Sequence, residues 1–160
     1  MATKEKNRAT IIVLSGDMDK VFAAYILAST AAAAGMDTTM FFTFWGLQAI
    51  MKGHKTGKTT KGKMIGGFLK GGLDKLNPSR LSFGGMGRKM FRQMMDAKNV
   101  TSIADLREAC IDLGVHLLAC QMSMDVMEIA REDLIDEVED VVGAARAIKD
   151  ASESSINYFI

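Results

Sequence analysis

Cys120 is the residue whose type and position in this chain best suit chemistry. It ends the apolar run Val115–Ala119 and is followed by Gln-Met-Ser-Met-Asp-Val-Met. The run predicts a buried strand, and the segment after it predicts the first turn of a helix. A thiol at such a junction lies near unpaired backbone N–H groups and the positive end of a helix dipole. Both favour the reactive thiolate, so the position predicts sulfur chemistry.

A small, inert core residue is the competing interpretation of Cys120, because free cysteine is often buried. Asp125 also opposes a reactive thiol, since a nearby carboxylate raises a thiol pKa. Cys110 provides a contrast. It lies in an apolar helical seam with Ile103, Leu106 and Leu113, so we expect it to pack in the core.

Neither histidine pairs convincingly with Cys120. His116 points to the same face of the expected strand, but four residues at about 3.3 Å each place it roughly 13 Å away. That separation excludes direct activation, so His116 is expected to be a core histidine with satisfied hydrogen bonds. His54 reaches the site only if its glycine- and lysine-rich loop folds over it. Two histidines and two cysteines without ligand spacing predict no metal site.

The segment Gly53–Thr59 superficially resembles a phosphate-binding loop. The motif needs four residues between its glycines, and here only three separate Gly53 from Gly57. A preceding strand and a following helix are also missing from the pattern. We therefore expect no nucleotide site there, and no cofactor.

Alternating signals for strands and helices predict an α/β fold. The expected strands are Ala9–Leu14, Thr38–Phe44, Val115–Cys120, Val138–Val142 and Ile156–Ile160. The expected helices are Asp19–Ala34, Arg88–Lys98, Ile103–Leu113, Ser123–Ala130 and Ala144–Ser152. Short connections within the first 44 residues indicate a parallel βαβ unit. The prediction is a five-stranded parallel sheet, doubly wound, in the order 2-1-3-4-5, with helices on both faces.

This strand order places a candidate pocket at the carboxyl ends of the first and third strands. Ligands of doubly wound sheets bind where the strand order reverses, and the loops Ser15–Asp19 and Cys120–Met124 would meet there. Ser15, Gly16 and Asp17 are expected to wall the pocket. Ser123 would cap the helix behind Cys120. Two apolar residues, Trp45 and Met122, complete the predicted rim.

The length of 160 residues suits one domain over residues 1–160. The net charge of +1 gives no argument for nucleic acid. The uncharged stretch Val21–Met36 falls short of the roughly 20 residues that a membrane span needs. Two cysteines make no disulfide framework, so a reducing cytoplasm is the expected location.

Charge and glycine are unevenly distributed along the chain. The stretch Lys52–Arg92 holds eleven Lys or Arg and one acid, whereas Glu128–Asp140 is mostly acidic. Residues 52–87 contain ten of the fifteen glycines and are interpreted as a long excursion from the sheet, with a short helix within Met64–Leu76. The uncharged run Phe41–Met51 predicts self-association. The thirteen methionines suit core packing or a docking groove near Cys120.

Four motifs together resemble the methionine-rich branch of the DsrE/DsrF/DrsH-like family, over nearly the full length. They are Ile11-Ile-Val-Leu-Ser-Gly-Asp-Met-Asp-Lys20, Thr43-Phe-Trp-Gly-Leu47, Gly84-Gly-Met-Gly-Arg-Lys-Met90 and Ala119-Cys-Gln-Met-Ser-Met-Asp-Val-Met127. The last is the most specific, because it contains the cysteine in the context usual for the branch. The branch usually has glycine after this motif, where Glu128 stands here.

The resemblance implies a sulfur-relay protein of α/β subunits, commonly a homo-oligomer. Cys120 would carry sulfane sulfur as a persulfide, between a sulfur donor and an acceptor that are small thiols or thiol proteins. The lack of a general base at fixed spacing suits a carrier or sulfurtransferase better than a hydrolase. Two alternatives remain open. One is a peroxidase-type thiol enzyme with a resolving thiol near Cys120, and the other is a non-catalytic oligomeric binding module.

Overall fold

A five-stranded parallel sheet forms the centre of the molecule in the computed structural model, which describes residues 7–68, 71–80 and 82–160. The strands are β1 (Arg8–Val13), β2 (Asp37–Phe42), β3 (His116–Cys120), β4 (Asp140–Val142) and β5 (Ile156–Phe159). Every strand pair runs parallel. The α/β class and the five strands expected from the sequence are confirmed.

The strand order is β4-β3-β2-β1-β5. It differs from the expected 2-1-3-4-5, because β3 pairs with β2 rather than with β1, and β5 pairs with β1 rather than with β4. The chain adds β2, β3 and β4 successively on one side of β1, and only the last crossover returns to the other side. The order therefore reverses between β1 and β5, whereas Cys120 follows β3. With β2 lying between them, the loops after β1 and β3 do not meet at a switch point.

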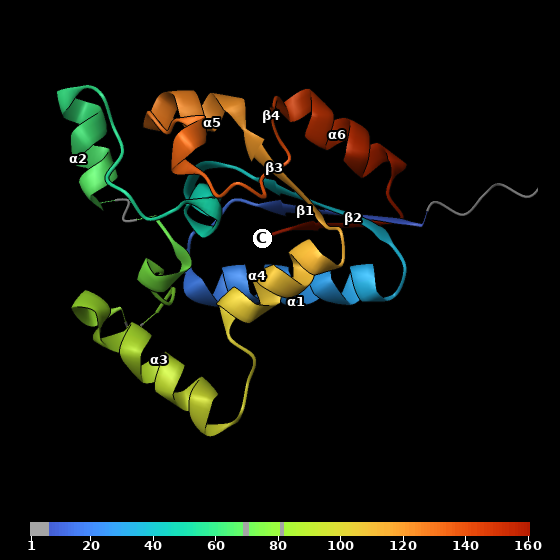
Figure 1. Cartoon of the computed structure of the whole chain (residues 1–160), viewed down its shortest axis with the longest axis horizontal. Helices are drawn as coiled ribbons and strands as arrows, with labels where there is room; N and C mark the ends of the chain where they lie inside the picture. Colours follow the sequence, from blue (N-terminus) through green and yellow to red (C-terminus); the bar gives the residue numbers. More distant parts are fainter. Residues whose placement is uncertain (1–6, 69–70, 81) are drawn as a thin grey trace, which may run out of the picture.

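Helices cover both faces of the sheet (Figure 1). The helices α1 (Met18–Ala33) and α4 (Ile103–Asp112) pack together on one face, and α6 (Ala144–Glu153) lies on the other. Alternate strand residues divide accordingly between two core clusters. Met40 and Leu117 belong to the cluster of α1 and α4, whereas Leu118 belongs to that of α6. No described helix combines the length and apolar character needed to cross a membrane.

The expected helix over Asp19–Ala34 is confirmed as α1, which is rich in alanine and followed by Gly35 in the left-handed region (φ 81°). Asp17 occupies the N-cap position but makes no capping bond, because its carboxylate pairs with Lys20 at 2.9 Å. The Met18 N–H instead donates to the carbonyl of Asn77 at 2.8 Å. A carbonyl of the excursion therefore caps the first N–H group of α1.

The apolar run after β2 forms a 3-10 helix, η1 (Phe44–Ile50), that the sequence did not predict. Gly46 allows η1 to lie against the end of β1, because a Cβ there would overlap the carbonyl of Val13. Most of the run packs inside, and only Phe44 and Trp45 are exposed. This is a correction to the expected self-association surface at Phe41–Met51, because burial of the run removes it from the surface.

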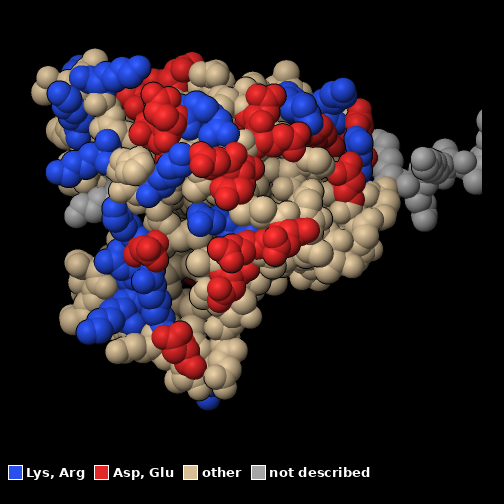
Figure 2. All heavy atoms as spheres, viewed as in Figure 1, with Lys and Arg blue, Asp and Glu red and all other residues tan. Residues whose placement is uncertain are grey.

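The excursion contains α2 (Thr60–Phe68) and two short 3-10 turns, and α3 (Met86–Ala97) begins at its end. Its helix begins and ends earlier than the expected Met64–Leu76. Figure 1 shows α2 and α3 beyond the carboxyl ends of the strands, and Figure 2 shows Lys and Arg gathered on that side. The N–H and hydroxyl of Ser79 both donate to the Asp19 carboxylate at 2.7 Å. These bonds fix the excursion to α1.

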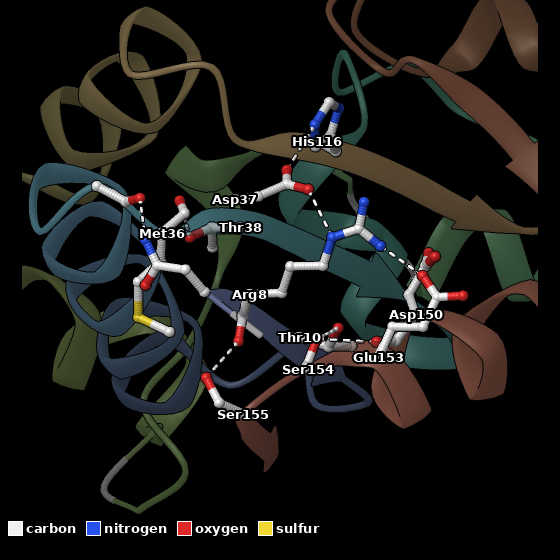
Figure 3. A network of polar contacts seen from close by, with 12 residues as sticks. Arg8, Thr10, Met36, Asp37, Thr38, His116, Asp150, Glu153, Ser154 and Ser155 are labelled. Atoms are coloured by element: carbon white, nitrogen blue, oxygen red, sulfur yellow. Dashed lines mark hydrogen bonds and ion pairs between the residues drawn. The ribbon is translucent and has the colours of Figure 1, made fainter. Parts of the chain in front are cut away.

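A polar network occupies the opposite, amino-terminal end of the strands (Figure 3). The Nε2 of His116 lies 3.1 Å from Asp37, and its Nδ1 contacts the carboxylate of Glu139. Carboxylates only accept hydrogen bonds, so only the imidazolium donates to both. The Glu139 hydrogen bond is the largest of the causes that raise the pKa of His116. His116 is satisfied, as expected, but its side chain is 41% exposed and is not a core residue.

Replacing His116 with Gln should make the stability less dependent on pH. A pKa raised in the folded state stabilises the fold fully below the ordinary value of about 6.5, and the stabilisation is lost as pH rises through the folded value. We expect His116→Gln to lower the free energy of unfolding by about 1 kcal/mol near pH 6 and by less near pH 9. Urea denaturation of both proteins at the two pH values measures this. An equal loss at both would contradict a charged His116.

Candidate functional site

Cys120 lies where β3 ends and α5 (Gln121–Met127) begins, as the sequence predicted. It is the last paired residue of β3, opposite Val142 of β4, and it is the N-cap residue of α5. Its side chain belongs to the α6-side core cluster, with Phe41 and Leu118. Only 2% of the residue is exposed, so the thiol is covered.

Thr43 lies beside Cys120, and the strand register explains why. Phe42 is paired with Ala119, so the next residue of each strand, Thr43 and Cys120, come side by side on the same face. The first turn of α5 then brings Ser123 to the same place. The two hydroxyls, of Thr43 and Ser123, are buried and hydrogen-bonded to each other at 2.8 Å.

These neighbours control the pKa of Cys120. Burial is the largest single influence and raises it, because an apolar environment disfavours the charged thiolate. The Ser123 hydroxyl and N–H, the Thr43 hydroxyl and the Met122 N–H act in the opposite direction, and together they hold the pKa below its ordinary value. One of the two hydroxyls donates its proton to the other in their hydrogen bond. The proton of the second hydroxyl remains free to donate to sulfur. The site therefore favours a buried thiolate.

Cys110 has the opposite environment. It is fully buried in the core cluster of α1 and α4, on the other face of the sheet from Cys120. Its thiol donates a hydrogen bond to the Tyr25 carbonyl at 3.5 Å, and a carbonyl oxygen gives a thiolate no support because it can only accept. Burial raises its pKa to about 12. Both cysteines are free, and their placement on opposite faces offers no resolving thiol for a peroxidase-type reaction.

The predicted pocket residues do not surround Cys120 as one group. Ser15, Gly16, Asp17 and Trp45 line a cleft of about 770 Å³ between the loop after β1, η1 and the excursion. Cys120 and Ser123 do not line this cleft. Met122, the remaining predicted rim residue, is 59% exposed on α5. The sheet order is the reason for this correction, because β2 and η1 separate the two loops expected to meet.

Glu128 ends α5 and connects it to the excursion. Its backbone is in the left-handed region (φ 51°), and its carboxylate accepts the N–H groups of Lys58 and Thr59 and the Thr59 hydroxyl. These hydrogen bonds hold its pKa below the ordinary value. Gly62 completes the contact, because a Cβ there would overlap the Glu128 carboxylate. The start of α2 is thus attached to the helix that follows Cys120.

Two residues at this site, Thr43 and Glu128, were missed from the sequence. Thr43 had a usable signal, since it ends the second strand as Cys120 ends the third, but using it requires knowing that the two strands are neighbours. Glu128 had only its departure from the family pattern. His54, which the sequence placed at the site only if its loop folded over it, is exposed in the excursion. No cluster of three metal-ligating side chains occurs among the described residues.

Comparison with known proteins identifies relatives over nearly the whole chain. The sequence profile of the DsrE/DsrF/DrsH-like family matches residues 5–159. The protein YrkE of Bacillus subtilis is 40% identical over 99% of this chain and 99% of its own length. The sulfur carrier protein DsrE2 of Allochromatium vinosum is 38% identical, covering 98% of this chain and 99% of its own. The crystal structure of the ychN protein from E. coli shares the fold, with a TM-score of 0.54 at 13% identity, over 96% of this chain and 99% of that one.

Removing the hydroxyl donors should make Cys120 less reactive at neutral pH. Ser123→Ala and Thr43→Val together remove the hydroxyl proton that donates to sulfur and the hydroxyl that could replace it, so in the double variant the pKa of Cys120 should rise and the thiolate fraction should fall. We expect alkylation by iodoacetamide to slow about tenfold near pH 7, the size of one hydrogen bond to a charged group. Thr43→Ser keeps the hydroxyl and is the matched control. An unchanged pH profile of alkylation in the double variant Ser123→Ala, Thr43→Val would show that these hydroxyls do not stabilise the thiolate.

Two substitutions at Glu128 should distinguish the effect of its carboxylate from the effect of its strained backbone. Glu128→Ala and Glu128→Gly both remove the acceptor, so the amides of Lys58 and Thr59 should exchange hydrogen faster in both. Only glycine adopts a positive φ without strain, and Glu128→Gly should be the more stable of the two by about 1 kcal/mol. Hydrogen exchange and urea denaturation measure the two effects. Unchanged exchange at both amides would contradict the attachment of α2 through Glu128.

Proposed function

Because the chain belongs to the DsrE/DsrF/DrsH-like family, we propose that it is a sulfur-relay protein that carries sulfane sulfur as a persulfide on Cys120. The observation that carries this proposal is the set of donors around the Cys120 thiol, which lowers its pKa although the residue is buried. A relative of similar length with the name sulfur carrier protein supports the same chemistry. The protein would act in a reducing compartment, such as the cytoplasm.

Sulfur transfer needs only thiolate exchange. The Cys120 thiolate attacks the outer sulfur of a donor persulfide, a new S–S bond forms at Cys120, and the donor's own S–S bond breaks. The donor leaves as a thiolate with the bonding electron pair. An acceptor thiolate then attacks the outer sulfur on Cys120, and Cys120 is the leaving thiolate. No external oxidant or reductant enters either step.

The donors around Cys120 would help in both steps. A lower pKa increases the fraction of attacking thiolate in the first step and makes Cys120 a better leaving group in the second. The hydroxyls of Thr43 and Ser123 also have acceptor capacity left for a protonated persulfide. Thr43, Met122 and Ser123 are thus proposed to bind and position the sulfur, whereas Cys120 alone forms covalent bonds.

Transfer also requires access, and the thiol is only 2% exposed. Cys120 is the N-cap residue of α5, a short helix of seven residues with Met122 and Val126 on its exposed side. A local displacement of α5 would open the thiol to a donor while the sheet stays intact. Low stability of the covering element is common where ligands must enter.

Assembly into a homo-oligomer is part of the proposal, at a different surface from that expected. The edge strand β5 exposes Ile156, Tyr158 and Phe159, and α6 exposes Ile148. An unpaired edge with apolar side chains favours association with another copy. Sulfur donors and acceptors would be small thiols or thiol proteins.

A binding module without sulfur chemistry is the second candidate, and α3 is the observation that favours it. Met86, Met90 and Met94 repeat every four residues along α3 and are exposed by 72%, 46% and 59%. Arg88, Lys89 and Arg92 lie on the same helix. An exposed methionine stripe is typical of adaptable docking surfaces.

Mass spectrometry of the sulfur-loaded protein tests the first candidate. Reduced protein treated anaerobically with polysulfide should gain whole sulfur atoms, which peptide mapping should place on Cys120 and a reductant should release. Cys120→Ser should lose the addition. Cys110→Ser is the matched control and should retain it, because burial keeps Cys110 protonated.

An unmodified Cys120 would argue for the binding module, provided that a small alkylating agent still reaches the thiol. The loaded protein should also pass its sulfur to an added thiol, with loss of the mass increment. Retention of the increment in the presence of excess thiol would contradict a carrier.

A further inference from the structure

The cleft that contains Ser15 and Trp45 has properties that the sulfur chemistry does not use. It measures about 770 Å³, within the range of roughly 300–1,000 Å³ typical of small-molecule sites. It lies between three parts of the chain: the start of α1, η1 and the excursion. Cys120 does not line it, so its contents do not follow from the thiol.

Positive charge dominates the charged groups of the cleft. Its lining includes the cations Lys20, Lys75 and Arg88 and a single carboxylate, Asp17. Asp17 is paired with Lys20 at 2.9 Å, so these two charges compensate each other. Lys75 donates to the neutral Gly53 carbonyl at 2.8 Å, and within the described residues neither Lys75 nor Arg88 pairs with a carboxylate. Among the described residues, two positive charges of the cleft, those of Lys75 and Arg88, therefore have no carboxylate to balance them.

The backbone around the cleft adds to the same preference. Gly84 and Gly85 line it just before α3, a helix of 12 residues. That helix has no side-chain cap and no acidic residue in its first turn, so no carboxylate there opposes an anion, although the N–H groups of Gly85 and Met86 already donate to the carbonyls of Ser82 and Phe83. Gly16 lets the loop after β1 approach η1, because a Cβ there would lie 2.6 Å from the Trp45 carbonyl. The cleft is thus lined by cations from separate segments and by backbone that glycines bring close together.

Aromatic side chains form the apolar part of the lining. Trp45 and Phe68 both line the cleft, and 53% of Trp45 is exposed. An exposed indole beside unpaired cations suits a ligand that has a flat ring at one end and negative charge at the other. The segment Gly53–Thr59, which resembles a phosphate loop, contributes no lining residue.

We propose that this cleft binds a small organic anion with at least two negative charges and a flat ring. Lys75 and Arg88 hold the charged end, and Trp45 stacks against the ring. The site is separate from Cys120 and stands independently of the persulfide chemistry. Lys20 remains paired with Asp17.

Trp45 provides a direct measurement, because it is the only tryptophan of the chain. ADP, which combines a flat ring with a diphosphate, is titrated into the full-length protein at constant ionic strength, with Trp45 fluorescence and calorimetry as readouts. Inorganic pyrophosphate and adenosine test the two ends of the probe separately. ADP should bind more tightly than either one alone.

Arg88→Gln is the principal variant, and Lys89→Gln is its matched control. Both remove one positive charge from the first turns of α3, but Lys89 is exposed and does not line the cleft. Arg88→Gln and Lys75→Gln should each weaken ADP binding about tenfold, as expected for loss of one charge-assisted hydrogen bond. Lys89→Gln and Cys120→Ser should bind as the unmodified protein does. Circular dichroism checks that each variant is folded.

Three results would overturn the proposal. The first is the absence of any ADP response in the folded protein. The second is an equal loss of affinity in Lys89→Gln and Arg88→Gln, which would indicate diffuse attraction to the basic excursion. The third is binding of pyrophosphate as tight as that of ADP, which would remove the ring from the site. If the protein fails to bind ADP but still loads persulfide, only the proposal for this cleft is overturned. If it binds ADP but does not load persulfide, only the proposed carrier function is overturned.

Discussion

Pairing of β2 with β1 on one side and β3 on the other is the constraint on which the remaining structure depends. β2 is the central strand, and five of its six residues are buried. Its register brings Thr43 beside Cys120 on the face of α6. Its continuation into η1 brings Trp45 to the loop after β1. One strand therefore places groups at two separate sites, and it also separates them.

The two cysteines show that burial alone does not decide the state of a thiol. Both are almost completely covered, yet the pKa of Cys110 is raised to about 12 and that of Cys120 is lowered. The difference lies in the neighbouring groups, because Cys110 contacts a carbonyl, whereas the hydroxyls and N–H groups near Cys120 lower its pKa. A strand end is where such N–H groups are available, since the first turn of a helix leaves them unpaired.

Local patterns predicted the elements but not their neighbours. The β-branched and apolar runs located all five strands, and the junction after Val115–Ala119 correctly placed Cys120 at a helix start. Strand order depends on how the crossovers pack against the sheet, which no local pattern records. The predicted pocket was therefore wrong, because Ser15 and Cys120 were expected to line it together. Thr43 and Glu128 were missed for the same reason, because their partners are distant in sequence.

The excursion is hydrogen-bonded to the residue that ends the helix after Cys120. Glu128 directly follows α5, and its carboxylate accepts hydrogen bonds from Lys58 and Thr59 at the start of α2. Ser79 fixes the later part of the excursion to Asp19 on α1. A displacement of α5 as a unit carries Glu128 with it and strains the bonds to α2, whereas the bonds to α1 are unaffected. The access proposed for sulfur transfer would therefore link uncovering of Cys120 to release of α2, and the positive φ of Glu128 places strain at the residue that joins α5 and α2.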